Sequence, residues 1–444
     1  MNQTTLNGLT GKKILIATVA ADGHFNPLTG LAKFLADSGA DVRWYTSVVH
    51  ENKLRQLGIP HFPFLKAIDI NANNIHNLFP QRKFLTDAGQ KANFDMINIF
   101  IKPGPDHFED IRDIQQEFSF DAIVTESMFP AIPYLSARLD VPVISIGIIP
   151  LAESSDDLGP YGPGFYPPSN ADEQENIARL NKAFNEEVYK EHIDCLSLLL
   201  SRYDIQHQRT NVFDMLIKTS DLYLQIGSPS FEYTRSNMGQ NVRFIGSLLP
   251  YSARTSENRW DDQRLDEYQK VVLVTQGTIE NDITKLLEPT LEAFKGTDTL
   301  VIATTGGNQT QELRTKYPYN NLIIEDYIPF DEVMPFAHVY ITNGGYGGTL
   351  LGIKNRLPMV AAGLFEGKAE ICARVGYFKY GIDLKTERPT PDEIRNAVVN
   401  VLADPVYKNN ITALADEMEQ YDARELCAKY LVELLNQYNT INVA

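Results

Sequence analysis

The chain has 444 residues, of which 43% are hydrophobic and 22% are charged. This is the composition of an ordinary globular protein, and the length exceeds what one hydrophobic core usually organises, so we expect two domains. The formal net charge of −17 argues against nucleic acids and anionic membrane surfaces as partners, because both are bound through basic patches.

The first half of the chain predicts repeated strand–helix units. Residues 13–19, KILIATV, form a continuous apolar run that is typical of a strand buried on both faces of a parallel sheet. A polar loop follows, and we expect the first helix to begin at Pro27 and to end at Gly39. This alternation indicates a doubly wound parallel sheet. Further strands are predicted at 41–47, 121–127 and 141–147.

The segment 150–170 breaks this alternation. It is rich in proline, glycine and aromatic residues, so we expect a loop that becomes ordered on binding. A long helix is predicted over residues 173–200. We assign residues 1–235 to an N-terminal domain and the polar segment 236–269 to a linker region.

A second alternating set of strands and helices begins at Val271. The pattern predicts a second doubly wound domain at 270–415, and C-terminal helices at 416–444 that pack back across both domains. Two such sheets that face one another place a cleft at the carboxyl ends of their strands, where these folds bind ligands. The predicted fold class is therefore α/β, with two facing Rossmann-like parallel sheets.

A glycine-rich loop in the second domain is the clearest candidate binding site. A buried strand runs into Asn343-Gly344-Gly345-Tyr346-Gly347-Gly348-Thr349, which opens a helix. Glycines let the backbone approach a pyrophosphate, and the N–H groups at a helix start attract anions. A turn used only for tight packing is the alternative, because the pattern is not GxGxxG. A second loop, Gly277-Thr278, ends another strand of the same domain and would reach the same phosphates.

His24 and Glu126 are the candidate catalytic residues. His24 lies in the loop after the first strand, where an imidazole faces the cleft and can accept a proton. Glu126 ends another strand of the same sheet, so its carboxylate emerges on the same side and can orient the histidine. A structural histidine and a solvated carboxylate are the alternatives, and Asp22 is a second candidate partner for His24.

The two motifs resemble those of family 1 glycosyltransferases of the GT-B fold. Residues 13–27, which end in GHFNP, resemble the opening of these enzymes, and residues 327–376 resemble their donor-binding signature. The resemblance spans both domains, and the nearest branch is that of bacterial macrolide and flavonoid glycosyltransferases, including soil-bacterial enzymes that glycosylate polyphenols. It implies an inverting, metal-independent transfer of a hexosyl or 6-deoxyhexosyl group from a nucleotide-sugar to a hydroxyl of a small apolar or phenolic acceptor such as a flavonoid.

The resemblance also implies roles for individual residues. His24 would deprotonate the acceptor hydroxyl, and Glu126 stands where these enzymes place the aspartate that orients the base. Tyr327 and the backbone of Ile328 would hold the nucleobase, and Glu366 and Lys368 would contact the sugar or the phosphates. The residues that would hold the diphosphate are Gly277, Thr278, Asn343, Gly344, Gly345, Gly347, Gly348 and Thr349.

Departures from the family pattern predict the donor. Asn343 stands in place of a histidine, and Leu351 in place of a glutamate that binds the ribose hydroxyls. Gly367 and Lys368 replace the Asp-Gln pair that grips glucose. Because an unpaired buried hydroxyl costs about 1–3 kcal/mol, a leucine facing the 2′ position favours a nucleotide without that hydroxyl. We therefore expect a dTDP-linked 6-deoxyhexose, with L-rhamnose first and UDP-glucose next.

Acceptor contacts are expected from the N-terminal domain, because sites for small molecules are mostly apolar with few polar anchors. A small aromatic or macrocyclic acceptor would fit such a site. Core packing explains aromatic side chains equally well. The candidates are Phe25, Phe79, Phe94, Met128, Phe129, Tyr161 and Phe165.

No cofactor is expected beyond the nucleotide-sugar co-substrate. The cysteines Cys195, Cys372 and Cys427 are far apart and fit no metal or disulfide spacing. The N-terminal residues lack the apolar run of a signal peptide, and no stretch approaches the roughly 20 apolar residues of a membrane span. We therefore expect a cytoplasmic location.

Two other functions remain open at this point. A sugar-nucleotide epimerase shares the GT-B architecture, and a non-catalytic helper protein would keep the donor site but lack a working base. A nicotinamide-dependent oxidoreductase is excluded, because the loop after the first strand lacks GxGxxG.

Overall fold

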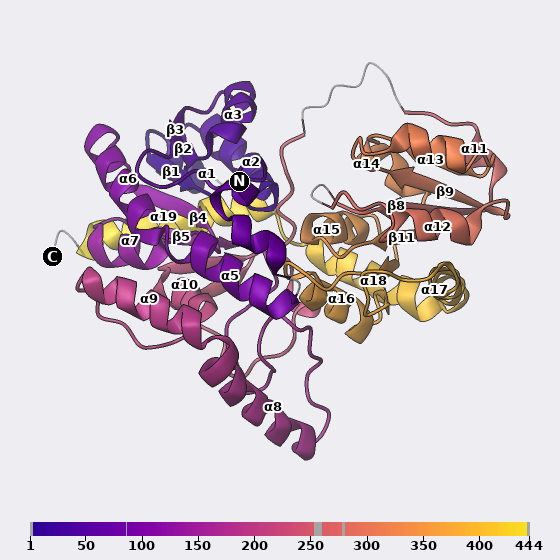
Figure 1. Cartoon of the computed structure of the whole chain (residues 1–444). Coiled ribbons are helices and arrows are strands. Elements are labelled where there is room, and N and C mark those ends of the chain that lie inside the picture. The colour runs from indigo at the N-terminus through magenta and orange to yellow at the C-terminus, as the bar shows by residue number, and fades with distance from the viewer. Residues whose placement is uncertain (1–2, 86, 253–259, 278–279, 442–444) are drawn as a thin grey trace.

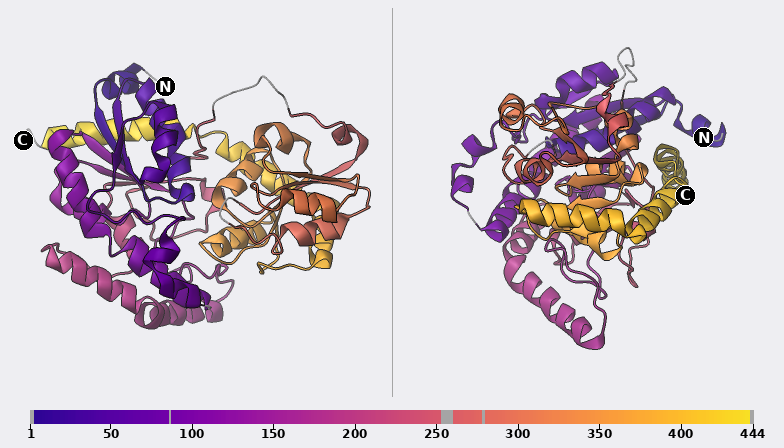
Figure 2. Two further views of the ribbon diagram at one scale, coloured as in Figure 1. Left: turned by 45° about the horizontal axis from the view of Figure 1, so that its top comes forward. Right: turned by 90° about the vertical axis from the view of Figure 1, so that its right-hand side faces the viewer.

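The computed structural model describes residues 3–85, 87–252, 260–277 and 280–441 (Figure 1). Two α/β domains lie side by side, and each is built on one parallel sheet flanked by helices (Figures 1 and 2). The predicted fold of two doubly wound parallel sheets is confirmed.

The N-terminal sheet has seven strands in the order β3-β2-β1-β4-β5-β6-β7, and all neighbouring strands are parallel. The strands are β1 Lys13–Ala17, β2 Asp41–Thr46, β3 His61–Pro63, β4 Ala122–Glu126, β5 Val143–Gly147, β6 Leu222–Gln225 and β7 Val242–Phe244. The helices of this half are α1 Gln3–Leu9, α2 Asp22–Asp37, α3 Glu51–Leu57, α4 Ile75–Leu78, α5 Ala88–Phe100, α6 Gly104–Glu117, α7 Ile132–Arg138, α8 Ala171–Ala183, α9 Lys190–Arg202 and α10 Val212–Thr219.

The C-terminal sheet has six parallel strands in the order β10-β9-β8-β11-β12-β13. The strands are β8 Lys270–Thr275, β9 Thr299–Thr304, β10 Leu322–Glu325, β11 Val339–Thr342, β12 Met359–Ala361 and β13 Gly381–Asp383. The helices are α11 Arg264–Glu267, α12 Leu287–Phe294, α13 Thr310–Lys316, α14 Phe330–Val333, α15 Tyr346–Lys354, α16 Lys368–Tyr377, α17 Pro391–Ala403, α18 Pro405–Met418 and α19 Ala423–Ile441.

The apolar run of β1 is explained by burial on both faces. Ile14 and Ile16 belong to one hydrophobic cluster, whereas Leu15 and Ala17 belong to another. Successive side chains of a strand point to opposite faces, and helices cover both. The strand therefore has no solvent-facing side that would require polar residues.

The first helix begins earlier than expected. The Ala21 carbonyl accepts hydrogen bonds from the His24 and Phe25 N–H groups, so α2 starts at Asp22 and Pro27 lies inside it. Proline has no N–H to donate, which removes only the helical bond to the carbonyl four residues earlier. His24 therefore sits in the first turn of a helix and not in a loop.

Three further segments bear on the expected boundaries. The predicted helix over 173–200 is two helices, α8 and α9, separated by a π-helical turn at Phe184–Val188. Strand β7 lies in the segment expected as a linker, and it pairs with β6 as the last strand of the N-terminal sheet. The last helix, α19, packs against α1 and α2 and runs along the N-terminal domain (Figure 2).

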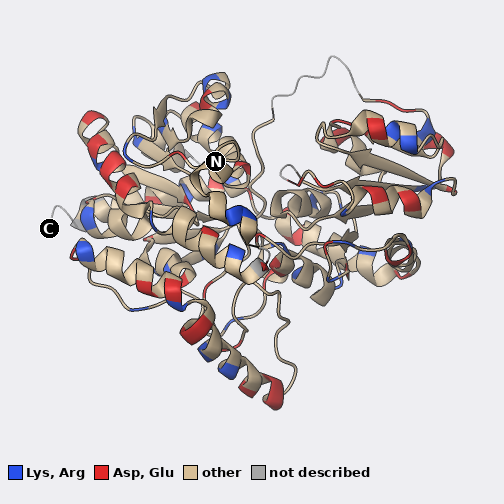
Figure 3. Cartoon of the chain, in the orientation of Figure 1, with Lys and Arg blue, Asp and Glu red and all other residues tan. Residues whose placement is uncertain are grey.

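The charges on the surface and the apolar character of the helices bear on the predicted partners. Acidic side chains lie along outer helices such as α6 and α8, with basic residues interspersed (Figure 3). Among the described residues, no helix combines the length and the apolar character that crossing a membrane requires.

A buried group of charges joins the two domains. Arg374 of α16 is 1% exposed, and its guanidinium donates to Glu232 Oε2 from Nε at 2.9 Å and from Nη2 at 2.7 Å. Nη1 donates to Glu370 Oε2 at 3.0 Å. Glu370 Oε1 in turn accepts the N–H groups of Gly162 and Gly164, at 2.6 and 3.0 Å, from the proline- and glycine-rich loop. One guanidinium therefore connects α16 with two segments of the N-terminal half.

Replacing this arginine should destabilise the whole protein. In Arg374→Met, two buried carboxylates lose their counter-charge, and we expect a loss of about 3–5 kcal/mol of unfolding free energy. Arg388→Met is the matched control, because Arg388 pairs with Asp282 at the surface and such pairs are worth about 1 kcal/mol or less. Urea unfolding, monitored by circular dichroism, measures the unfolding free energy of both variants. Equal urea midpoints for the two variants would show that the buried charged group contributes no more stability than the surface pair.

Candidate active site

The two candidate catalytic side chains come from neighbouring strands. β1 and β4 are parallel partners, with Ala17 opposite Thr125. The chain leaves β1 and enters α2, whose first turn carries His24, and Glu126 is the last residue of β4. The same edge of the sheet therefore presents both side chains.

His24 and Glu126 form a close pair. His24 Nδ1 lies 3.0 Å from Glu126 Oε2, with the glutamate side chain 0% and the histidine side chain 17% exposed. The Met128 N–H donates to the same Oε2 at 2.7 Å and fixes the carboxylate. Neither His24 Nδ1 nor Glu126 Oε1 has a hydrogen-bond partner among the described residues. A carboxylate at Nδ1 favours the tautomer with its proton there, which leaves Nε2 as the proton acceptor.

The residues around this pair define its environment. Phe100, at the end of α5, stacks on the His24 ring with centroids 5.6 Å apart and an interplanar angle of 26°. Asp22 is held by Lys53 at 2.8 Å and is not the partner of His24. Phe25 points away from the pair, because it is fully buried and stacks on His50 at 3.9 Å. In this structure the Phe25 ring has no exposed surface for an acceptor.

The glycine-rich loop opens α15 as expected. β11 ends at Thr342, and Gly344 adopts a φ of +78°, where a Cβ would come within 2.6 Å of Cys372 Sγ. Gly345 caps the helix without a side-chain hydrogen bond. The first N–H groups of a helix have no acceptor within it, so those of Tyr346, Gly347 and Gly348 form a positively polarised end that attracts anions. A Cβ on Gly347 would meet nothing within 4 Å, so this turn faces open space.

Asn343 and Thr349 brace this loop from within. Asn343 is 9% exposed, its Nδ2 donates to the Gln276 carbonyl, and its Oδ1 accepts the Gly345 N–H at 3.3 Å. Thr349 is fully buried, and its hydroxyl donates to the Gly345 carbonyl at 3.0 Å. Gly277 lies beside the Asn343 amide, so the two loops are neighbours. Thr278 lies outside the described residues.

The remaining donor-site candidates lie at other strand ends of the same sheet. Tyr327 follows β10 and is 74% exposed, with its hydroxyl donating to the Gly306 carbonyl at 2.8 Å, whereas Ile328 is buried. Lys368, the first residue of α16, pairs with Glu366 at 2.9 Å. Leu351 on α15 is half-buried against the hydrophobic core.

The acceptor candidates do not gather in one place. Phe79 and Phe94 meet edge to face with centroids 5.7 Å apart. Met128 and Phe129 are buried in the hydrophobic cluster below β4. Tyr161 and Phe165 line a separate cavity between the domains, which contains neither His24 nor Glu126.

The structure also reveals a residue that the sequence analysis did not assign to the site. Tyr346, inside the glycine-rich loop, is buried, and its hydroxyl donates to the Ile226 carbonyl of the N-terminal domain at 2.7 Å. Its ring also stacks on Phe231, with centroids 5.9 Å apart. The loop is thereby attached to the sheet that carries His24. No local pattern signals this contact, because its partners are 120 residues apart.

The described residues also bear on metal binding. Among the residues that the structure describes, no three histidine, cysteine, aspartate or glutamate side chains are grouped as metal ligands. The described residues provide an imidazole that can accept a proton in the N-terminal domain and a helix end that attracts anions in the C-terminal domain.

The chain is similar to known proteins over most of its length. Residues 288–434 match the C-terminal domain of the erythromycin biosynthesis protein CIII-like family. The chain is 33% identical over 415 residues to 4'-demethylrebeccamycin synthase of Lentzea aerocolonigenes, covering 93% of this chain and 97% of that protein. It is 28% identical to UDP-glucosyltransferase 1 of Beauveria bassiana, covering 95% of each.

Two solved structures show the same fold. The glycosyltransferase of kitacinnamycin superposes with a TM-score of 0.72 at 17% identity, covering 96% of this chain and 99% of that one. The spinosyn rhamnosyltransferase SpnG complexed with thymidine diphosphate superposes with a TM-score of 0.64 at 14% identity, covering 95% and 99%. With a full-length relative at 33% identity and both domains of the fold in place, the chain belongs to the family 1 glycosyltransferases of the GT-B fold and is a glycosyltransferase enzyme.

Proposed function

We propose that this enzyme transfers a sugar, with inversion, from a nucleoside diphosphate to a hydroxyl group of a small apolar acceptor, and that His24 is the catalytic base. The observation that carries the proposal is the 3.0 Å approach of Glu126 Oε2 to His24 Nδ1 at the carboxyl edge of the N-terminal sheet. A base oriented in this way suits proton removal from a weakly acidic hydroxyl.

The reaction then follows from these residues. His24 Nε2 takes the proton of the acceptor hydroxyl, and the carboxylate of Glu126 stabilises the imidazolium that forms. The acceptor oxygen attacks the anomeric carbon as the bond from that carbon to the diphosphate oxygen breaks. The departing diphosphate carries the electron pair, and the N–H groups at the start of α15 stabilise its negative charge.

The proposed donor is a dTDP-linked 6-deoxyhexose, with L-rhamnose first and UDP-glucose next. The apolar Leu351 and the mutual pairing of Glu366 with Lys368 support a donor with few hydroxyl groups. The thymidine diphosphate bound to the rhamnosyltransferase SpnG supports the same choice. The relative named as a UDP-glucosyltransferase supports UDP-glucose as the second candidate.

The proposed acceptor is an aromatic natural product such as a flavonoid, bound along α5. Every side chain from Asn93 to Phe100 on this helix is half-buried, which provides a continuous and partly open surface. Phe100 stacks on His24 and Phe94 contacts Phe79, so this surface is aromatic and ends at the base. The name of the bacterial relative, a rebeccamycin synthase, supports a natural-product acceptor.

Removing the base should abolish turnover without affecting donor binding. In His24→Ala we expect kcat to fall by about 10²–10⁴, the usual contribution of general base catalysis, while the Kd for the nucleoside diphosphate stays unchanged. Glu126→Gln keeps an oxygen for the Met128 N–H but loses the charge, so kcat should fall with KM preserved. Steady-state kinetics and calorimetry measure these effects. Turnover in His24→Ala within threefold of the parent enzyme would refute the proposed base.

Alanine substitutions at the adjacent glycines Gly347 and Gly348 test the proposed diphosphate site. Gly347→Ala adds a methyl group to open space at the start of α15, so we expect normal melting and a roughly tenfold weaker affinity for nucleoside diphosphate. Gly348→Ala is the contrast, because its Cβ would lie 2.8 Å from the buried Tyr340 hydroxyl and should destabilise the domain by about 1–3 kcal/mol. Calorimetry and thermal melting separate the two effects. Unchanged nucleotide affinity in Gly347→Ala would place the diphosphate elsewhere.

The donor is tested by an activity screen read by mass. With phenolic and macrolide acceptors, kcat/KM for dTDP-L-rhamnose should exceed that for UDP-glucose by about tenfold, the factor expected from one unpaired buried hydroxyl. The product should gain the mass of a deoxyhexose. A preference for UDP-glucose would contradict the donor assignment. Sugar conversion without any acceptor would instead indicate an epimerase, and nucleotide binding without turnover a helper protein.

A further inference from the structure

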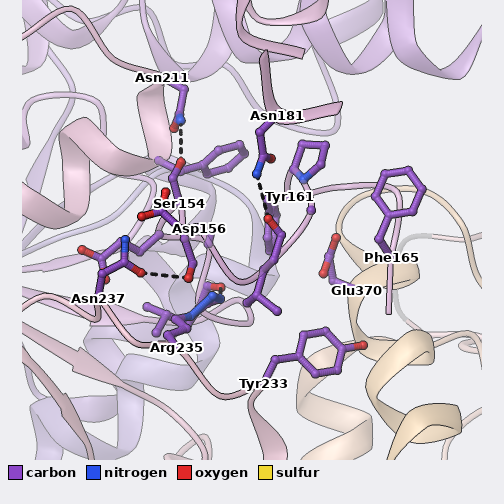
Figure 4. Close-up of a pocket in the computed structure, with 18 of the residues that line it drawn as sticks. Ser154, Asp156, Tyr161, Phe165, Asn181, Asn211, Tyr233, Arg235, Asn237 and Glu370 are labelled. Atoms are coloured by element: carbon purple, nitrogen blue, oxygen red, sulfur yellow. Dashed lines mark hydrogen bonds between the residues drawn. The ribbon is translucent and has the colours of Figure 1, made fainter. Parts of the chain in front are cut away.

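A second cavity lies outside the proposed active site. It has a volume of about 310 Å³ and lies between the loop that begins at Leu151, the segment 233–237 and helix α16 (Figure 4). Its lining contains neither His24 nor Glu126 nor any residue of the glycine-rich loop. The volume falls in the range of small-molecule binding sites.

Arg235 offers unused hydrogen-bond donors at this cavity. Its Nη2 donates to the Leu151 carbonyl, which anchors the guanidinium. Its Nε and Nη1 are buried and have no hydrogen-bond partner among the described residues. Buried donors are almost always paired, so two adjacent unpaired nitrogens on a cavity-lining side chain indicate a missing acceptor.

Two amide side chains at the cavity use only one of their two polar atoms in hydrogen bonds within the protein. Asn181 Nδ2 donates to the Leu158 carbonyl at 2.8 Å, which leaves its carbonyl oxygen as an acceptor. Asn237 Oδ1 accepts from Ser155 Oγ at 2.8 Å, which leaves its Nδ2 as a donor. The exposed carboxylate of Asp156 adds another acceptor. The cavity therefore presents both donors and acceptors.

The charges around Arg235 disfavour an anionic ligand. Burial and the neighbouring charge of Arg374 lower the pKa of the Arg235 guanidinium, whereas the carboxylates of Glu232, Glu153 and Glu370 raise it. Three carboxylates therefore lie near the two guanidinium groups of Arg235 and Arg374, and this cluster has no surplus of positive charge. An added anion would have to approach the carboxylates, whereas a neutral hydroxyl can accept from the guanidinium without that repulsion.

We propose that this cavity binds a neutral polyhydroxylated ligand of monosaccharide size. Its hydroxyl groups accept from Arg235 and Asn237 and donate to Asp156 and Asn181. Aromatic side chains of the lining, such as Phe165 and Tyr161, cover its C–H surface. The ligand is either a free sugar or a sugar already attached to a larger molecule.

The position of the cavity means that a bound ligand contacts segments that join the two domains. Glu370, which lines the cavity, holds the N–H groups of Gly162 and Gly164 and pairs with Arg374. α16, which carries Glu370, begins at Lys368 beside the glycine-rich loop, since a Cβ on Gly344 would lie 3.3 Å from the Lys368 carbonyl. A bound sugar therefore contacts the segments that fix the two domains relative to one another.

Saturation-transfer NMR on the whole protein tests the proposal. The probes are D-glucose, L-rhamnose and p-nitrophenyl β-D-glucoside, with UDP and dTDP in excess to occupy the donor site. We expect binding in the parent protein and at least tenfold weaker binding in Arg235→Met, because hydrogen bonds to charged groups are among the strongest. Asn237→Ala, at an exposed position, should weaken binding several-fold and serves if Arg235→Met fails to fold. Arg209→Met, a surface arginine paired with Asp194, should bind as the parent does.

Each outcome decides the proposal. Binding of the free sugars would identify a monosaccharide site. Binding of the glucoside alone would identify a site for a sugar that is attached to a larger molecule. Either result supports the proposal. Unchanged sugar binding in Arg235→Met and Asn237→Ala would overturn the proposal. Binding of inorganic phosphate in place of sugars would also overturn it, as would a crystal soaked in D-glucose that shows only water in the cavity. His24→Ala should retain sugar binding, so failure of the proposed catalytic function would be seen separately.

Discussion

Every step of the proposed reaction depends on how firmly two separate sheets are held against each other. The proposed base lies in the N-terminal domain and the proposed anion-binding helix end in the C-terminal domain, so neither half is complete alone. Two buried contacts fix their relation: the guanidinium of Arg374 with Glu232, and the Tyr346 hydroxyl with the Ile226 carbonyl. The second is the more direct, because Tyr346 is itself in the first turn of α15. Proximity contributes to catalysis only when such geometry is held to within a fraction of an ångström.

Residues at the ends of strands could be predicted from the sequence, because their placement follows from topology alone. An apolar run such as residues 13–19 is typical of an interior strand, and the carboxyl end of a strand lies beside that of its parallel neighbour. That argument placed His24 and Glu126 on one edge before any distance was known. The position of the glycine-rich loop between a buried strand and a helix could be predicted in the same way, whereas its role at a diphosphate stays a prediction.

Side-chain direction and long-range contacts could not be predicted in this way. Pro27 suggested the start of a helix that in fact begins at Asp22, and each residue of a helix turns by about 100°. Phe25, adjacent to His24, therefore points into the core and not toward an acceptor. The contacts of Arg374 with Glu232 and of Tyr346 with Ile226 join residues 142 and 120 positions apart. No local pattern encodes such pairs.

In the proposed reaction, the asparagine at position 343, where the resemblance leads one to expect a histidine, affects how the leaving diphosphate is stabilised. Asn343 is neutral, and both ends of its amide hold the loops together by bonding the Gln276 carbonyl and the Gly345 N–H. The charge of Lys368 is offset by Glu366. The proposal therefore assigns most of the stabilisation to the backbone N–H groups at the start of α15. Such dipoles are fixed in place before the reaction and need no reorganisation as charge develops, which is the property that makes a preorganised site effective in catalysis.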